Sequence, residues 1–247
     1  MKLIGYSFLI LFLSSNLFAQ IADDAVDNIL TLYFQTLNQD KLLQTNTYVT
    51  IGKIVHANTE VPFTSYNKKP MSYRIEFESQ GQKFITTFNG SSGWTINPLT
   101  GSSDPQPMSS EEVERTKLQA DYAGMFYNYK EKGYTVEFID KEDVGFIETY
   151  VLKLTTADED EITAYIDTQD NVLLKTSSYV IVDDVQEEYE LYYKDHRFVN
   201  EILIPFTIET KVDNKTEMKM IVDEITFDVD IPDSMFEMPV DNSNDSE

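Results

Sequence analysis

Residues 71–88, MSYRIEFESQGQKFITTF, decide the fold of this chain. Apolar and polar side chains alternate through the first half of the stretch. The apolar side of this predicted strand carries Met71, Tyr73, Ile75 and Phe77. Gln80-Gly81-Gln82 then reads as a turn into a second strand, whose one side carries Phe84, Thr86 and Phe88. The stretch therefore predicts a β-hairpin with one buried face and one face in water.

The same period-two pattern extends over most of the chain. It predicts further strands at 46–57, 92–97, 134–140, 147–156, 161–167, 171–182, 185–194, 202–212 and 216–228. Strands with one apolar and one polar face indicate an antiparallel sheet that is covered on one side, and so large a twisted sheet is expected to curl. Pro205 predicts that the strand at 202–212 is an edge strand or contains a bulge.

Two segments have the helical period instead. Residues 22–43 predict an amphipathic helix. Ser109 followed by Glu112 forms a capping-box pattern, which predicts a second helix over residues 110–131 after a proline-containing loop. We expect one domain at 20–240, and an acidic disordered tail at 241–247.

The N-terminus and the composition limit the location and the partners. Residues 1–19 have the basic start, apolar core and small-residue end of a cleaved signal peptide. The chain contains no cysteine, which excludes disulfides, thiolate metal sites and a lipid anchor on cysteine. A formal net charge of −24 disfavours nucleic acids and anionic membranes as partners. We therefore expect an exported protein that is not lipid-anchored.

The sequence offers little catalytic chemistry. Its two histidines, His56 and His196, have no metal-binding or catalytic spacing, and His196 is expected in a solvated loop. Residues 158–161, DEDE, are read as a hairpin turn rather than a calcium loop. We expect no enzyme activity, no metal and no cofactor. A hydrolase with paired carboxylates stays a distant alternative, because nearly all carboxylates fall on the outward side of the strands.

An apolar sheet face beneath helices can be filled completely, as an ordinary core, or incompletely, as a ligand cavity. Met125, Met218 and Met220 are flexible side chains that suit either outcome. The residues alone leave both readings open.

Four stretches resemble one known family in their order and spacing. They are residues 88–98 (FNGSSGWTINP), 144–154 (VGFIETYVLKL), 165–175 (YIDTQDNVLLK) and 225–236 (ITFDVDIPDSMF). Together, behind a signal peptide, they are similar to the LolA/LolB-like periplasmic carriers, particularly the outer-membrane lipoprotein-sorting proteins. The resemblance implies a mainly β fold with helices: a curled antiparallel half-barrel of about 10–11 strands whose concave face the helices cover.

The resemblance also implies a function. Such a protein shields lipoprotein acyl chains, or another lipid, in a hydrophobic cavity and carries them across the periplasm toward the outer membrane. It would be a monomer that exchanges cargo with inner- and outer-membrane transfer proteins. The helix at 110–131 would be its lid. Alternation predicts the lining residues Tyr73, Ile75, Phe77, Leu152, Leu154, Phe206, Ile208, Met218 and Met220, with Met125 and Phe126 from the lid.

This sequence differs from the family pattern at two places, and two other functions compete with the carrier hypothesis. In the carriers an arginine holds the lid closed, but the nearest candidate, Arg74, falls on the polar side of its strand. Either a bulge turns it inward or that latch is missing. Asn38-Gln39 stands where the family has a glycine pair. The rivals are a lipid-sensing or regulatory module on the same scaffold and an inert domain with a filled core. If Leu152 lines the lipid cavity of a carrier, Leu152→Arg is expected to weaken lipid binding more than it lowers expression.

Overall fold

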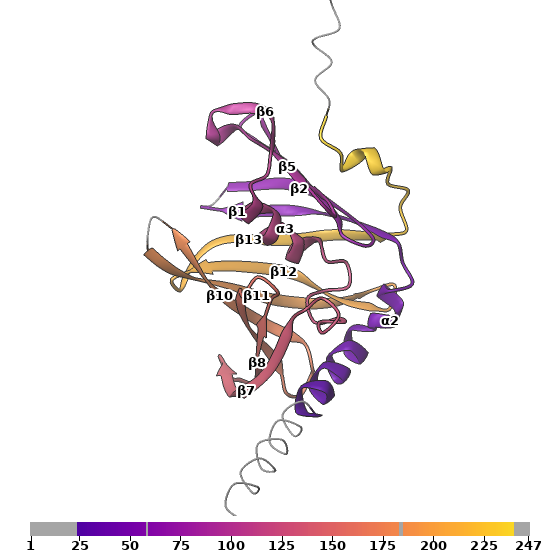
Figure 1. Ribbon diagram of the computed structural model, residues 1–247, viewed down its shortest axis with the longest axis vertical. Coiled ribbons are helices and arrows are strands. Elements are labelled where there is room, and N and C mark those ends of the chain that lie inside the picture. The colour runs from indigo at the N-terminus through magenta and orange to yellow at the C-terminus, as the bar shows by residue number, and fades with distance from the viewer. Residues whose placement is uncertain (1–23, 58, 183–184, 240–247) are drawn as a thin grey trace, which may run out of the picture. The chain divides into compact units, whose positions relative to one another are not determined.

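The computed structural model describes residues 24–57, 59–182 and 185–239 (Figure 1). The predicted signal peptide at 1–19 and the predicted tail at 241–247 lie outside these ranges. Within them, no helix is both long enough and apolar enough to cross a membrane.

The structure contains one open antiparallel sheet of 13 strands, in the order β6-β5-β4-β3-β2-β1-β13-β12-β11-β10-β9-β8-β7. The strands are β1 Thr47–His56, β2 Thr59–Lys68, β3 Ser72–Ser79, β4 Gln82–Asn89, β5 Gly93–Asn97, β6 Ser102–Pro107, β7 Thr135–Val144, β8 Ile147–Thr155, β9 Glu161–Asp167, β10 Leu173–Val182, β11 Val185–Val199, β12 Ile202–Val212 and β13 Lys215–Phe227. The sheet is not closed, as a half-barrel requires. The predicted fold class, mainly β with helices, is confirmed.

All eleven predicted strands are present, and the two additional strands are β2 and β6. Polar side chains on both sides of β2, and Pro62 within it, hide its alternation. Strand β6 contains two prolines and was expected to be a loop, but it lies at the sheet edge, where a missing backbone N–H is tolerated. Of the two outcomes expected from Pro205, the edge position is wrong, because β12 lies between β13 and β11. A bulge in β12 stays a prediction.

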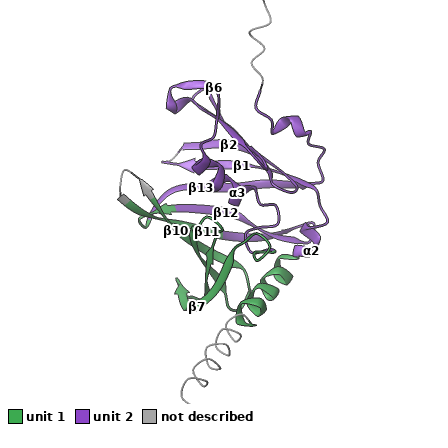
Figure 2. Ribbon diagram, viewed as in Figure 1, with its two compact units in different colours: residues 1–38, 128–193, 211–214 green, residues 39–127, 194–210, 215–247 purple. Residues whose placement is uncertain are grey.

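The chain divides into two compact units (Figure 2). Unit 1 contains residues 1–38, 128–193 and 211–214, and unit 2 contains residues 39–127, 194–210 and 215–247. Strands β11 and β12 therefore contribute residues to both units.

Unit 1 has a packed core. Val26, Ile29 and Leu30 of a helix over residues 24–37 are buried. Burial, and then the nearby hydroxyl of Tyr193, raises the pKa of Tyr33 on the same helix. On the sheet, Leu152 of β8 is in register with Phe138 of β7 and Ala164 of β9. Leu152, Leu154, Ala164 and Ile166 are each 0% exposed. The apolar side of this part of the sheet is therefore completely filled.

The helices are shorter than predicted. Asn38, with φ of 56°, separates the helix over residues 24–37 from the short α2 (Gln39–Leu42), so the predicted helix at 22–43 is two helices. The predicted capping box of Ser109 and Glu112 is present and begins α3 (Ser110–Ala120). Helix α3 ends before residue 131, because Asp121 is extended and Gly124 has φ of 81°. Two 3-10 turns, η1 (Pro98–Thr100) and η2 (Asp233–Met235), complete the helical elements of the described ranges.

An ion-pair cluster around the buried Glu209 fastens β12 in unit 2. Glu209, 5% exposed, accepts hydrogen bonds from Lys194 and from Thr216 (2.6 Å), and Lys219 Nζ lies 3.4 Å from its carboxylate. Burial alone would raise the pKa of Glu209, but the bonds to Lys194 and Thr216 and the charges of Lys194 and Lys219 lower it from 4.5 to about 2.

This cluster predicts a pH dependence of stability. Because the folded-state pKa is below the unfolded-state value, the stabilisation is complete above about pH 4.5 and disappears as the pH falls toward 2. We expect Glu209→Gln to lower the free energy of unfolding by about 1–2 kcal/mol at pH 7, because water screens the half-exposed Lys194 and Lys219, and by far less at pH 2. Urea unfolding at both pH values measures this, with the exposed Glu217→Gln as control. Equal losses at both pH values would contradict the assignment.

Candidate functional site: two faces of the unit 2 sheet

The two faces of the unit 2 sheet carry different side chains. Register places Phe227, Tyr48, Asn67, Tyr73 and Phe88 in one row across β13, β1, β2, β3 and β4. Cross-strand partners point to the same side of a sheet. We call this side the lid face. The opposite side, which carries Arg74, Thr87 and Trp94 in register, we call the strap face.

The lid face is covered by the segment at 110–127, which we call the lid segment. Helix α3 contacts β3 and β4. After α3, the ring of Tyr122 packs on Tyr48 at 5.1 Å between centroids, and its hydroxyl lies 2.6 Å from the hydroxyl of Thr45. Gln39 of α2 donates a 2.7 Å hydrogen bond to the carbonyl of Ala123. The lid segment is therefore anchored at one end by three contacts: to α2, to Thr45 in the connection that follows it, and to β1.

A second, aromatic group lies on the lid face. It is separate from the row that runs from Phe227 through Tyr48, Asn67 and Tyr73 to Phe88, which we call the tyrosine row. Phe63, Phe77 and Phe84 are in register across β2, β3 and β4, and the rings of Phe77 and Phe84 stack at 4.8 Å. Gly52 leaves the space that the Phe63 ring occupies, because a Cβ there would lie 2.8 Å from that ring and 2.2 Å from the Ile221 carbonyl oxygen. Only glycine fits this position without a shift of the backbone.

The predicted lining residues fall into two groups by exposure. Seven are partly exposed: Tyr73, Ile75, Phe77, Met125, Ile208, Met218 and Met220. Four are buried: Phe126, Leu152, Leu154 and Phe206. Leu152 and Leu154 belong to unit 1, and the other nine belong to unit 2. Phe206 packs in a core cluster with Val222 and Ile225.

The sequence prediction omitted several lid-face residues. Tyr48, Asn67 and Phe63 lie in the same rows as predicted residues. Asn67 and Phe63 belong to β2, which was not predicted, so no signal pointed to them. Tyr48 lies in a predicted strand, and the alternation of β1 could have identified it.

The strap face is crossed by residues 229–239, which we call the strap. Lys68 Nζ donates to the Ile231 carbonyl (2.8 Å), and Trp94 Nε1 donates to the Phe236 carbonyl (3.2 Å). Ile231 and Phe236 are buried, at 3% and 2% exposed. The strap is thus held by side chains that bond to its backbone, rather than by strand pairing.

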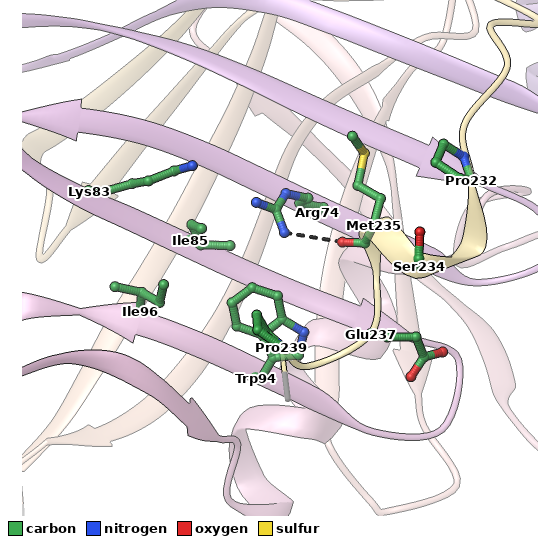
Figure 3. Close-up of a pocket in the computed structure, with 10 residues that line it drawn as sticks. All are labelled: Arg74, Lys83, Ile85, Trp94, Ile96, Pro232, Ser234, Met235, Glu237 and Pro239. Carbon is green, nitrogen blue, oxygen red and sulfur yellow. Dashed lines mark hydrogen bonds between the residues drawn. The ribbon is translucent and has the colours of Figure 1, made fainter. Parts of the chain in front are cut away.

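A shallow cavity of about 440 Å³ remains between the strap and β3, β4 and β5 (Figure 3). Its charged groups are already paired. Arg74 bonds Glu76 (2.7 Å) and the Met235 carbonyl (3.1 Å), and Lys83 Nζ lies 3.6 Å from Glu76. Burial would raise the pKa of Glu76, but Arg74 and then Lys83 bring it below its usual value. The cavity therefore presents no unpaired charge from Arg74 or Glu76 to a ligand.

Arg74 does not hold the lid in this protein. As the alternation predicts, it lies on the strap face, where it binds the strap and stacks on Trp94 at 5.4 Å. Its role is structural.

Removing Arg74 should therefore affect stability. We expect Arg74→Met to lower the free energy of unfolding by about 2–4 kcal/mol, because it leaves Glu76 and the Met235 carbonyl without their donor. Urea unfolding measures the loss, and the double variant Arg74→Met/Glu76→Met should recover part of it. A double variant no more stable than Arg74→Met would contradict this structural pairing.

The two histidines lie in strands β1 and β11, and the acidic segment at 158–161 lies at a turn. His196 lies half-buried in β11, not in the predicted loop, and burial lowers its pKa. His56 Nδ1 lies 2.7 Å from the Glu217 carbonyl oxygen. The residues between Thr156 and Asp160 form the predicted turn between β8 and β9, closed by a 2.9 Å backbone hydrogen bond. No three His, Asp or Glu side chains of the described residues are grouped to hold a metal ion.

Comparison with known proteins gives a likeness of structure rather than of sequence. No protein-family profile matches the sequence, and no curated protein matches it in a sequence comparison. A DUF1329 family protein from Desulfovibrio piger is similar in structure, with a TM-score of 0.59, 14% identity and coverage of 85% of this chain and 97% of that one.

Two further structures are similar. A LolA superfamily protein from Nitrosomonas europaea has a TM-score of 0.58 and 14% identity, and covers 82% of this chain and 96% of its own. A putative outer membrane lipoprotein-sorting protein domain from Vibrio parahaemolyticus has a TM-score of 0.54 and 10% identity. This match covers 77% of the present chain and 89% of the Vibrio chain. Identities this low establish the fold alone. The resemblance predicted from the sequence is confirmed at that level: the chain has a LolA/LolB-like fold.

Proposed function

We propose that this protein is a periplasmic carrier that shelters the acyl chains of a lipid or lipoprotein on the lid face of unit 2. One observation carries the proposal: seven of the predicted lining side chains remain partly exposed, including Ile75, Phe77 and Met220. In a completely filled core these side chains would be buried, as Leu152 and Leu154 are in unit 1. The LolA/LolB-like fold supports the same function.

The energetics suit reversible binding. Each buried methylene contributes about 0.8 kcal/mol, so an acyl chain of ~15 carbons offers on the order of 10 kcal/mol. Moving the lid segment and ordering the ligand reduce this value, which allows the cargo to leave. Flexible methionines such as Met218 and Met220 can adapt to chains of different shape. The protein needs no cofactor and acts as a monomer, not as an enzyme.

The proposed location and partners follow from the same account. Residues 1–19 direct the chain to the periplasm and are removed there, without a lipid anchor. An inner-membrane protein loads the cargo and an outer-membrane protein receives it. The strongly negative surface favours basic docking regions on both.

Binding of an environment-sensitive acyl probe tests the proposal. Titration of the purified protein with a fluorescent C16 fatty-acyl probe should give saturable binding of one ligand, with a blue shift of emission. Absence of saturable binding at probe concentrations below aggregation would reject it.

The lid anchors predict the rate of release. Gln39→Ala removes the hydrogen bond to Ala123, which is worth about 1 kcal/mol, so bound probe should dissociate about fivefold faster. Stopped-flow displacement of the probe by unlabelled lipid measures the rate. Lys41→Ala, at an exposed position of the same short helix, should release the probe at the wild-type rate. An unchanged rate in Gln39→Ala would exclude these residues as the lid anchor.

A lipid-sensing or regulatory module on the same scaffold is the second candidate. It is favoured by Phe146, which is fully exposed at the tip of the β7–β8 hairpin beside the 42% exposed Ile147. A stable protein partner would cover such side chains. A sensor should therefore co-purify in stoichiometric amount with that partner, and the complex should be lost in Phe146→Ser. A carrier should purify alone.

A further inference from the structure

The tyrosine row of the lid face contains polar groups that have no partner. Asn67 is 4% exposed, and its side-chain amide forms no hydrogen bond within the described residues. The hydroxyls of its register partners, Tyr48 and Tyr73, form none there either. The only fully enclosed polar side-chain atom without a partner among the described residues is the Thr87 hydroxyl, so the unpaired polar atoms of Asn67, Tyr48 and Tyr73 border space that a water molecule can reach.

An unpaired buried amide is costly, at about 1–3 kcal/mol. Asn67 has two donors and one acceptor to satisfy. Burial raises the pKa of both Tyr48 and Tyr73, so both hydroxyls stay protonated and can donate. The row thus presents several hydrogen-bond donors among apolar side chains.

The charges around this row are already engaged. Lys69 Nζ lies 5.2 Å from the Tyr122 ring and donates to the Leu43 carbonyl. The Asp121 carboxylate accepts from the backbone N–H of Ala123. The row itself, from Phe227 to Phe88, contains no ionisable group except tyrosine. A neutral acceptor therefore suits this row better than a phosphate or a carboxylate does.

The polar and the aromatic side chains of the lid face lie at different positions along the strands. The aromatic group of Phe63, Phe77 and Phe84 lies four residues along the strands from the row of Asn67 and Tyr73, roughly 13 Å away. A polar end and an apolar end at this separation match a molecule with a neutral carbonyl at the start of a hydrocarbon chain.

We propose that Asn67, together with Tyr48 and Tyr73, binds the ester or amide carbonyl through which an acyl chain is joined to its headgroup, with the chain directed toward Phe77 and Phe84. This rests on the proposed function and names its ligand chemistry: acyl esters or amides rather than plain hydrocarbons or ethers. Asn67 Nδ2 and the Tyr73 hydroxyl donate to the two lone pairs of the carbonyl oxygen, and the Tyr48 hydroxyl completes the polar end of the site.

A pair of matched lipids tests this assignment. 1-Monopalmitoylglycerol has an ester carbonyl, and 1-O-hexadecylglycerol has the same chain length and headgroup without it. Displacement of the fluorescent acyl probe gives the dissociation constant of each. We expect the wild-type protein to prefer the ester by about tenfold, from two hydrogen bonds of about 1 kcal/mol each less the cost of ordering.

Three variants make the result specific. Asn67→Leu keeps the branched shape of the side chain, with a somewhat larger volume, and should reduce the preference to within twofold while the ether affinity is retained or improved. Tyr73→Phe removes one hydroxyl and should reduce it about threefold, so the test stands even if Asn67→Leu folds poorly. Thr87→Val is the control: it also removes an unpaired buried hydroxyl, but on the strap face, and should leave the preference unchanged.

The outcomes separate the two proposals. If neither lipid displaces the probe, the carrier function itself fails. If both lipids bind wild-type protein equally, or if both Asn67→Leu and Tyr73→Phe keep the full ester preference, the carbonyl site is overturned and the carrier function stands.

Discussion

Met220→Arg should abolish acyl binding and leave the protein folded. Met220 is partly exposed on β13, in register with Ile54, and lies two residues from Val222 of the core cluster. The long arginine side chain can extend its guanidinium to water, so the sheet tolerates it. An acyl chain bound at this position would have to desolvate that charge, at a cost of several kcal/mol.

We expect affinity for the C16 probe to fall at least 50-fold and the melting temperature to fall by only a few degrees. Ile51→Arg is the matched control, because Ile51 is 46% exposed on the strap side of neighbouring β1 and the change adds the same charge. Fluorescence titration and circular dichroism of both variants measure the effect. Wild-type affinity in Met220→Arg would exclude this part of the lid face as the cargo site.

Leu152→Arg should prevent unit 1 from folding. Leu152 is 0% exposed and lies in register between Phe138 and Ala164, so a guanidinium there has neither water nor a partner. An unpaired buried charge costs enough to cancel the 5–15 kcal/mol by which a typical domain is stable. The burial of Leu152 therefore leads to a different expectation from that of the sequence, in which Leu152→Arg weakens lipid binding more than it lowers expression.

Soluble yield and far-UV circular dichroism measure the effect. Phe146→Arg is the control, since Phe146 lies on the same hairpin but is fully exposed, and this variant should fold normally. A well-folded Leu152→Arg protein with a binding defect would contradict the core assignment and return Leu152 to the cargo site.

Much of the fold follows from local pattern. The alternation of residues 71–78 predicts β3 and assigns Arg74 to the side away from the lid, where the structure has it. Strand β2 escapes prediction, because Ser65 and Asn67 put polar groups on a face that is apolar in the neighbouring strands. The end of α3 escapes prediction as well, because the apolar residues after Ala120 continue at near-helical spacing while the backbone turns at Gly124.

The candidate site is only partly predictable for a related reason. Ile75 and Leu154 have the same alternating context, yet Ile75 is partly exposed and Leu154 is 0% exposed. Alternation assigns a side chain to a face, but the elements that cover the face decide whether it lines a site or fills a core. Asn67 is the clearest case. Its proposed role depends on its register partners Tyr48 and Tyr73, which lie on the neighbouring strands β1 and β3.

The central claim, that the lid face carries an acyl lipid, is tested most directly by native mass spectrometry of the protein purified from the periplasm, with extraction of whatever is bound. The account predicts a stoichiometric acyl ester or amide that is absent from Met220→Arg and present in Ile51→Arg. A mass equal to that of the polypeptide alone, together with no uptake of added monopalmitoylglycerol, would contradict it and identify the lid face as an ordinary core.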